Sequence, residues 1–285
     1  MLHRLSTALL LSSLLVAPAC GGDDDGGGGG GATDASVADS APRPDSAPLI
    51  DAEPPPDGMP VALGCEDEPL PDTAADPVTV SGTVLTIDGL DQVPVQGATV
   101  TALQVSDDSV IVSDTTGADG AFALEAATGG APIDAYLTAT GNGYQDTRLY
   151  PPFPVTSNLG GIPVPLLTED TLALLYVISG NVQRDPELGT VLLIVTDCDL
   201  NPVAGATVAS TPEAGAVVYG GDNGLPDANA NATGAQGIVF LLNVPVAEGL
   251  VVQGEVNGQP LRAHAVATEA NEVTATSLAP HAANL

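Results

Sequence analysis

The chain contains 285 residues, of which 36 are acidic and five are basic, so its formal net charge is -31 at neutral pH. All the basic residues are arginines, and the sequence holds no lysine and no tryptophan. A charge of this size repels nucleic acid and anionic lipid head groups, so we exclude both as direct partners. It favours cations, including calcium, or a basic protein.

Residues 1–19 are expected to form a signal peptide. The chain opens with a weakly positive start that includes Arg4, and the apolar run LSTALLLSSLLVA follows at 5–17. About 20 apolar residues are needed to cross a bilayer as a permanent helix, so this run is too short for that role. The sequence therefore predicts export of the chain.

Cys20 has two interpretations. Small residues precede it, so ordinary signal peptidase cleavage would leave it as a plain first residue of a secreted protein. The stretch before it also resembles a bacterial lipobox, which implies that its sulfur is acylated, for example with palmitate. The usual lipobox has leucine three places before the cysteine and serine or alanine two places before it. Ala17 and Pro18 stand at these two positions, which is a departure from the pattern. We expect a lipid-anchored protein of the bacterial cell envelope, and Gly21, which is not an aspartate, points to the outer membrane by resemblance to sorting rules.

Residues 20–76 are expected to form a disordered tether rich in acidic residues, glycine, proline and alanine. The segment begins GGDDDGGGGGG, repeats the unit DSAP, reaches three prolines at 54–56 and contains no aromatic residue. Proline and mutually repelling carboxylates extend a chain and leave it no core to bury. Fully extended, this arm would reach on the order of 150 Å from its anchor.

The remaining chain contains a repeated pattern. VQGATV at 95–100 recurs as VAGATV at 203–208, and TTGADGAF at 115–122 is matched by ATGAQGIV at 232–239. The glycines favour tight turns, and the alternating residues around them favour strands, with Val100 and Phe122 on the buried face. Extra residues in the second copy fall in the loop at 220–231.

These motifs resemble the carboxypeptidase regulatory-like module, a small immunoglobulin- or transthyretin-like β-sandwich. The resemblance implies an all-β fold with two Greek-key-type sandwiches in tandem, at 77–167 and 189–285. The first copy follows the family pattern through Tyr144. The second departs from it, because Gln236 replaces the turn aspartate and Val239 stands where the aromatic belongs.

A connector at 168–188 is expected to hold a short helix. Thr168 can cap it, two acidic residues suit its first turn, and Leu167 can pack on Leu172. Gly180 would end it. The alternative is another strand, since Leu174 to Ile178 is wholly apolar.

No motif for catalysis or for a cofactor is found, and the family resemblance implies no reaction. The three histidines are widely separated, and no cluster of histidine and cysteine has the spacing of a zinc site. We therefore expect no enzymatic activity, no cofactor and no catalytic residue.

Calcium or carbohydrate binding is the alternative function. Asp107, Asp108, Asp114 and Asp119 surround one expected hairpin, and Asp222, Asn223 and Asp227 crowd the loop at 220–231. Hard cations require several oxygens on a rigid turn, but solvated turn residues also account for both groups. For a glycan, Tyr144, Tyr150 and Phe153 are the candidate contacts.

If Cys20 carries lipid, Cys65 and Cys198 remain as an even pair in an oxidising compartment. A disulfide between them would link the modules and contribute on the order of 4 kcal/mol by loop closure. The alternative is two free thiols. The sequence as a whole predicts a non-enzymatic lipoprotein that uses two β-sandwich modules for structural or adhesive contact with an unidentified protein or surface polymer.

Overall fold

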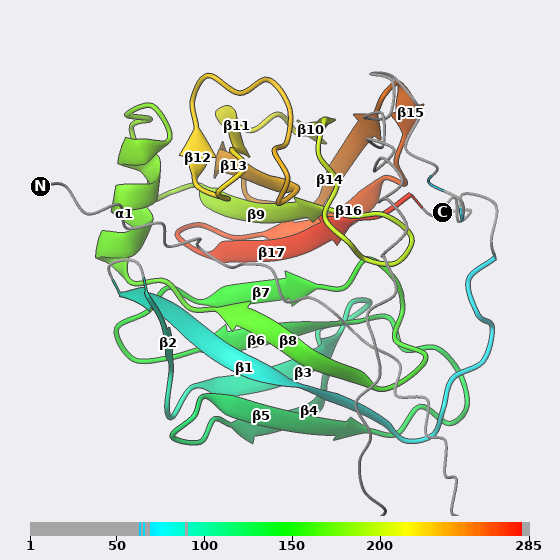
Figure 1. The fold of residues 1–285 in the computed structure, drawn as a ribbon. Coiled ribbons are helices and arrows are strands. Elements are labelled where there is room, and N and C mark those ends of the chain that lie inside the picture. Colours follow the sequence, from blue (N-terminus) through cyan, green and yellow to red (C-terminus); the bar gives the residue numbers. More distant parts are fainter. Residues whose placement is uncertain (1–62, 64, 66–68, 89–90, 281–285) are drawn as a thin grey trace, which may run out of the picture. The chain divides into compact units, whose positions relative to one another are not determined.

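A computed structural model describes residues 63, 65, 69–88 and 91–280 of the chain. The predicted all-β architecture with one short helix is confirmed (Figure 1). The first eight strands form what we call the first module: β1 (Val78–Asp88), β2 (Asp91–Pro94), β3 (Thr99–Gln104), β4 (Val110–Thr115), β5 (Ala121–Ala126), β6 (Ala135–Thr140), β7 (Thr147–Tyr150) and β8 (Leu159–Pro165).

Helix α1 (Glu169–Ile178) follows the first module. The strands after it form the second module: β9 (Gly189–Val195), β10 (Ala206–Thr211), β11 (Ala216–Gly220), β12 (Pro226–Asp227), β13 (Ile238–Val244), β14 (Ala247–Val256), β15 (Gln259–Pro260), β16 (His264–Thr268) and β17 (Val273–Leu278).

Each module packs two sheets around its own aliphatic core. In the first module, β1 pairs with β2, β5 and β8, and this sheet covers a second one in which β3 lies between β4 and β6. Alternate residues of β5 point inward, so Phe122, Leu124 and Ala126 are buried and their neighbours are exposed. The predicted burial of Val100 and Phe122 is confirmed.

One sheet of nine strands runs through both modules, in the order β12-β11-β13-β9-β17-β7-β6-β3-β4. The last strand of the chain, β17, pairs in parallel with β9 of its own module on one side and with β7 of the first module on the other. Figure 1 shows β17, in red, between these two strands. Tandem modules were expected from the sequence, and the structure adds that a common sheet joins them.

The turn motifs quoted from the two modules are held by the same set of hydrogen bonds. The Thr116 hydroxyl accepts from the Ala98 amide at 2.9 Å and donates to the Val95 carbonyl at 2.6 Å. In the second module the Thr233 hydroxyl makes the corresponding bonds with Ala206 and Val203, at 2.9 and 2.8 Å. Both hydroxyls therefore satisfy backbone groups that would otherwise be buried unpaired.

Glycine is required at the end of each of these turns. Gly120 and Gly237 have φ angles of 71° and 63°, in the left-handed region that side chains disfavour. A Cβ atom at either position would lie 2.6 Å or less from a backbone carbonyl, that of Val84 in the first module and that of Val195 in the second. Close approach of the turn to the central strand therefore depends on these residues in both modules.

Helix α1 covers the outer face of the nine-stranded sheet in the second module. Leu172 and Tyr176 are buried there with Phe240 and Leu242 of β13. Because α1 lies on one face and β10, β14 and β16 lie on the other, β13 is buried almost throughout. The predicted cap is confirmed, since the Thr168 hydroxyl accepts from the Thr171 amide at 3.1 Å.

Candidate functional site

The predicted signal peptide 1–19, the acylation site Cys20 and most of the tether lie outside the described residues. In the described part of the chain, no helix is both long and apolar enough to cross a bilayer.

Cys65 and Cys198 form a disulfide in the structure, with their Cα atoms 5.8 Å apart. Two residues before the bridge, Leu63 is 2% exposed and belongs to the core cluster of the second module. The chain then reaches the first module, where the Ala75 amide donates to Thr156. Leu63 and Cys65 therefore contact the second module, and Ala75 contacts the first.

The four calcium candidates of the first module do not meet at one point. Asp107 and Asp108 lie in the turn between β3 and β4, whereas Asp114 and Asp119 lie at the other end of β4. Successive strand residues are separated by about 3.3 Å, so the two pairs are on the order of 20 Å apart. Among the described residues, no three histidine, cysteine, aspartate or glutamate side chains are placed to hold a metal ion.

Each of these aspartates accepts a hydrogen bond from nearby protein groups. Asp107 accepts from the Ser109 amide at 3.1 Å, and bonds to Ser109 lower the pKa of Asp107. The amides of Ala123 and Thr115 donate to Asp114 at 2.9 and 2.8 Å and lower its pKa. These carboxylates stabilise turns, as the alternative interpretation expects.

The glycan candidates are separated as well. Tyr150 is 5% exposed and stacks on Tyr136 with ring centroids 4.7 Å apart. The Arg262 guanidinium lies 5.5 Å from the Phe153 ring centre, and Tyr144 packs against the first-module core. The three side chains therefore contact the protein itself and do not form one stacking platform.

A polar cluster joins the modules beside the β7–β17 pair. The Arg148 Nε atom of β7 donates to Glu272 at 2.9 Å, and its Nη2 atom lies 3.5 Å from Glu269. The guanidinium also lies 5.9 Å from the ring centre of Tyr136, whose hydroxyl donates to Asp108 at 2.8 Å. Charges from both modules and a ring of the first module thus meet at one junction.

The junction raises the pKa of both partners, so it favours the charged form of Arg148 and disfavours that of Glu272. Burial lowers the pKa of Arg148, but the hydrogen bond and negative charge of Glu272 outweigh burial, and the net pKa is raised. Burial raises the pKa of Glu272, and Arg148 opposes that shift. The cluster can hold one module on the other. Truncating Arg148 or Glu272 would weaken that contact, because it would leave a partly buried charge without its partner.

Sequence reasoning did not identify Arg148, Glu269 and Glu272 as site residues. Their ion pairs join positions more than 100 residues apart, and that contact depends on parallel pairing of β7 with β17. One signal was present, since five arginines among 36 acidic residues favour pairing of an arginine with a carboxylate.

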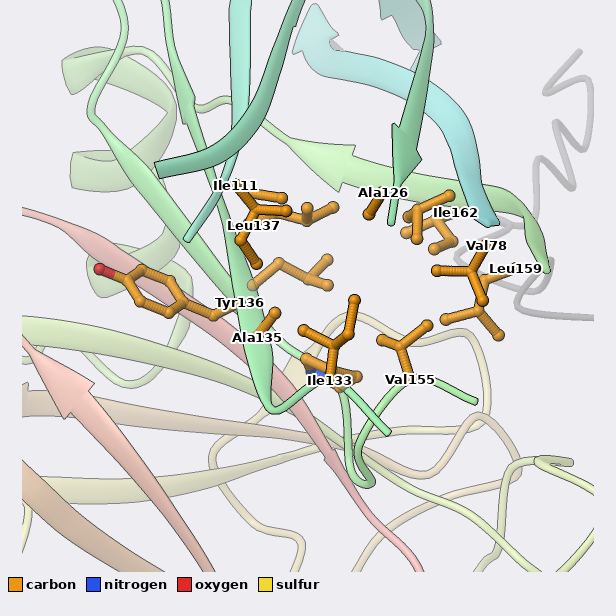
Figure 2. A pocket seen from close by; sticks show the side chains of 14 residues that line it. Val78, Ile111, Ala126, Ile133, Ala135, Tyr136, Leu137, Val155, Leu159 and Ile162 are labelled. Carbon is orange, nitrogen blue, oxygen red and sulfur yellow. The ribbon is translucent and has the colours of Figure 1, made fainter. Parts of the chain in front are cut away.

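A small cavity lies inside the first module at one end of its sandwich. Figure 2 shows aliphatic side chains around it, among them Val78 of β1, Ile111 of β4 and Val155 of the segment between β7 and β8, while the ring of Tyr136 points away. Its volume is about 40 Å³. Apolar cavities that hold a benzene-sized ligand are roughly 150 Å³, so this cavity is a packing gap within the core.

No family model and no curated protein sequence matches the chain. Solved structures of pilins are similar to it in part. The shaft pilin SpaA from Lactobacillus rhamnosus GG is 14% identical over 73% of this chain and 100% of that chain, with a TM-score of 0.24. The minor pilin GBS52 from Streptococcus agalactiae is 12% identical over 73% and 98% of the chains, with a TM-score of 0.22. The major pilin subunit BcpA from Bacillus cereus is 8% identical over 72% and 99%, with a TM-score of 0.25. At these identities and TM-scores the likeness assigns neither a fold nor a function to this chain.

Proposed function

We propose that the protein is a non-enzymatic lipoprotein of the bacterial cell envelope. An acylated Cys20 anchors it, the part of the acidic tether that precedes Leu63 holds the folded part away from the membrane, and two sandwich modules serve structural or adhesive contacts. The quoted turn motifs support a carboxypeptidase regulatory-like origin for both modules, because the hydroxyls of Thr116 and Thr233 are bonded in the same way.

The joining of the two modules is the observation that carries this proposal. Separate modules on a linker would move independently, whereas here β17 pairs with strands of both modules. The ion pair between Arg148 and Glu272 and the disulfide at Cys65 restrain the same junction. Such a body transmits force and presents its surface in a fixed orientation, as a structural or adhesive protein requires.

The anchor is tested by replacing its acylation site. A Cys20→Ser variant produced in a bacterial host should leave the detergent-soluble membrane fraction and appear in the soluble fraction, because it has no sulfur to acylate. Labelled palmitate should enter the wild type and not the variant. A Cys65→Ser variant, which keeps Cys20, is the matched control and should stay with the membrane. Membrane partitioning of Cys20→Ser equal to that of the wild type would refute the anchor.

A further inference from the structure

Helix α1 has a second apolar face that no other described part of the chain covers. While Leu172 and Tyr176 point into the core, Leu174, Val177 and Ile178 are 55%, 54% and 43% exposed. Their spacing of three and four residues aligns them on one side of the helix. The other large apolar side chains that are exposed in the described chain lie on separate strands and loops. Clustered exposure of this kind marks a contact surface more often than a scattered apolar residue does.

A hollow adjoins this face at the end of the helix. Ile178 forms one wall, and the loop between β11 and β13 forms the rest, including Leu225, Pro226 and Ala228. Asp222 and Asp227 also line the hollow. Each accepts a local backbone amide through its Oδ1 atom, from Ala235 at 3.2 Å and from Asn229 at 2.9 Å. The surface thus combines an apolar ridge with an acidic, partly apolar hollow.

The negative charge of this surface restricts the kind of partner that can bind there. The described arginines are engaged elsewhere: Arg148 pairs with Glu272, Arg184 with Glu169, and Arg262 donates to the Pro152 carbonyl. The chain contains no lysine. A second copy would bring another net charge of -31, and an anionic membrane would face the two aspartates, so both are electrostatically disfavoured.

We propose that this α1 surface binds a basic amphipathic segment of a partner protein. Apolar side chains of that segment would lie on Leu174 and Val177, and lysine or arginine side chains would pair with Asp222 and Asp227 in the hollow. The inference rests on the proposed function in one respect, since it takes the protein to work by binding. It names the chemistry of the partner and the surface that receives it.

A synthetic helix of leucine and lysine tests the proposal. A fluorescent peptide with all leucines on one face is titrated with the full-length protein, and its anisotropy is followed at low and moderate salt. Leu174→Ser/Val177→Ser should weaken binding by at least about tenfold. Asp222→Asn/Asp227→Asn should weaken binding several-fold and reduce its dependence on salt.

Control variants separate this surface from general attraction to an acidic chain. Val110→Ser changes an apolar residue that is 64% exposed in β4, and Asp91→Asn/Glu125→Gln neutralises two acids on the first module. Both control variants should bind the peptide as the wild type does, because their changes lie outside the α1 surface. The acidic tether is the same in all variants, so it cannot cause a difference between them. Equal losses in the controls, or equal binding of a twin peptide with glutamate in place of lysine, would overturn the proposal.

The other occupants give distinct results. A dimer in sedimentation that Leu174→Ser/Val177→Ser abolishes would assign the surface to a second copy, and binding to phosphatidylglycerol vesicles that the same change abolishes would assign it to lipid. Either result would overturn the proposal. If Leu174→Ser/Val177→Ser fails to fold, the comparison of Asp222→Asn/Asp227→Asn with the control Asp91→Asn/Glu125→Gln still tests whether the peptide binds at this surface. Membrane partitioning of Cys20→Ser is measured separately, so failure of the anchor and failure of this surface are distinguishable.

Discussion

His264 is a partly buried histidine whose pKa is strongly lowered in the folded protein. It lies in β16 near Arg262, and its Nε2 atom is buried without a hydrogen-bond partner in the described structure. Burial, together with the positive charge of Arg262, lowers its pKa to about 4. The folded protein therefore binds this proton less readily than the unfolded chain, whose histidine has a pKa of about 6.5. The resulting stability is present above pH 6.5 and is lost as the pH falls toward 4.

Replacing this histidine should flatten the acid sensitivity of the fold. Between pH 7 and pH 4 we expect the unfolding free energy of the wild type to fall by up to about 3 kcal/mol more than that of His264→Gln, which cannot gain a proton. Urea unfolding at a series of pH values measures the difference. Val246→Gln, at a position that is 50% exposed, should keep the wild-type pH dependence. If the unfolding free energies of the wild type and His264→Gln changed equally with pH, the lowered pKa of His264 would be contradicted.

Single residues were predictable where their role is local. The cap at Thr168 and the inward positions of β5 follow from neighbours in the sequence, and both are confirmed. The aspartates from Asp107 to Asp119 are close in sequence but lie at two ends of a strand. Arg148 and Glu272 are remote in sequence and yet 2.9 Å apart, so their pairing required the tertiary fold.

Among the elements, strand β8 shows why sequence patterns fail at some positions. Its sequence, LGGIPVP, contains glycine and proline, which disfavour strands, and it was not predicted. It nevertheless pairs with β1, in parallel and without another partner strand in the described chain. Proline is tolerated at a sheet edge because no donor is needed on the outer side. β17 pairs with its neighbour β9 in the same parallel manner but contains no proline, and it has partners on both sides.

A proline in β17 should therefore separate the modules. Ala275 pairs with Leu192 on one side and with Leu149 on the other, so Ala275→Pro removes a donor from the ladder and should cost at least about 2 kcal/mol. Ala275→Gly keeps the amide and should cost no more than about 1 kcal/mol. Hydrogen exchange of the β7 amides is the readout. Unchanged protection of β7 in Ala275→Pro would contradict the shared sheet.

For the whole molecule, the bridge between Cys65 and Cys198 closes a loop with a sequence separation of 133 residues. That loop contains the whole first module, α1 and strand β9 of the second module. When the two chain ends are pulled apart in single-molecule force spectroscopy, the oxidised protein should release only chain outside the loop. Reduction should add on the order of 450 Å of extension, at about 3.3–3.6 Å per residue. Cys198→Ser should behave as the reduced wild type under all conditions, and an oxidised protein that extends fully would contradict the bridge.

The same loop determines the route of mechanical load. Tension that arrives along residues 20–63 reaches the disulfide before it reaches β1, so it enters the second module at Cys198 and bypasses the covalent path through the first. Leu63, seated in the second-module core, receives that load at a buried position. For a load that leaves through the chain after Cys198, the first module lies outside the covalent path and the second module bears the pull. A surface on the first module would keep its shape under stress, whereas α1 lies on the module that takes the strain.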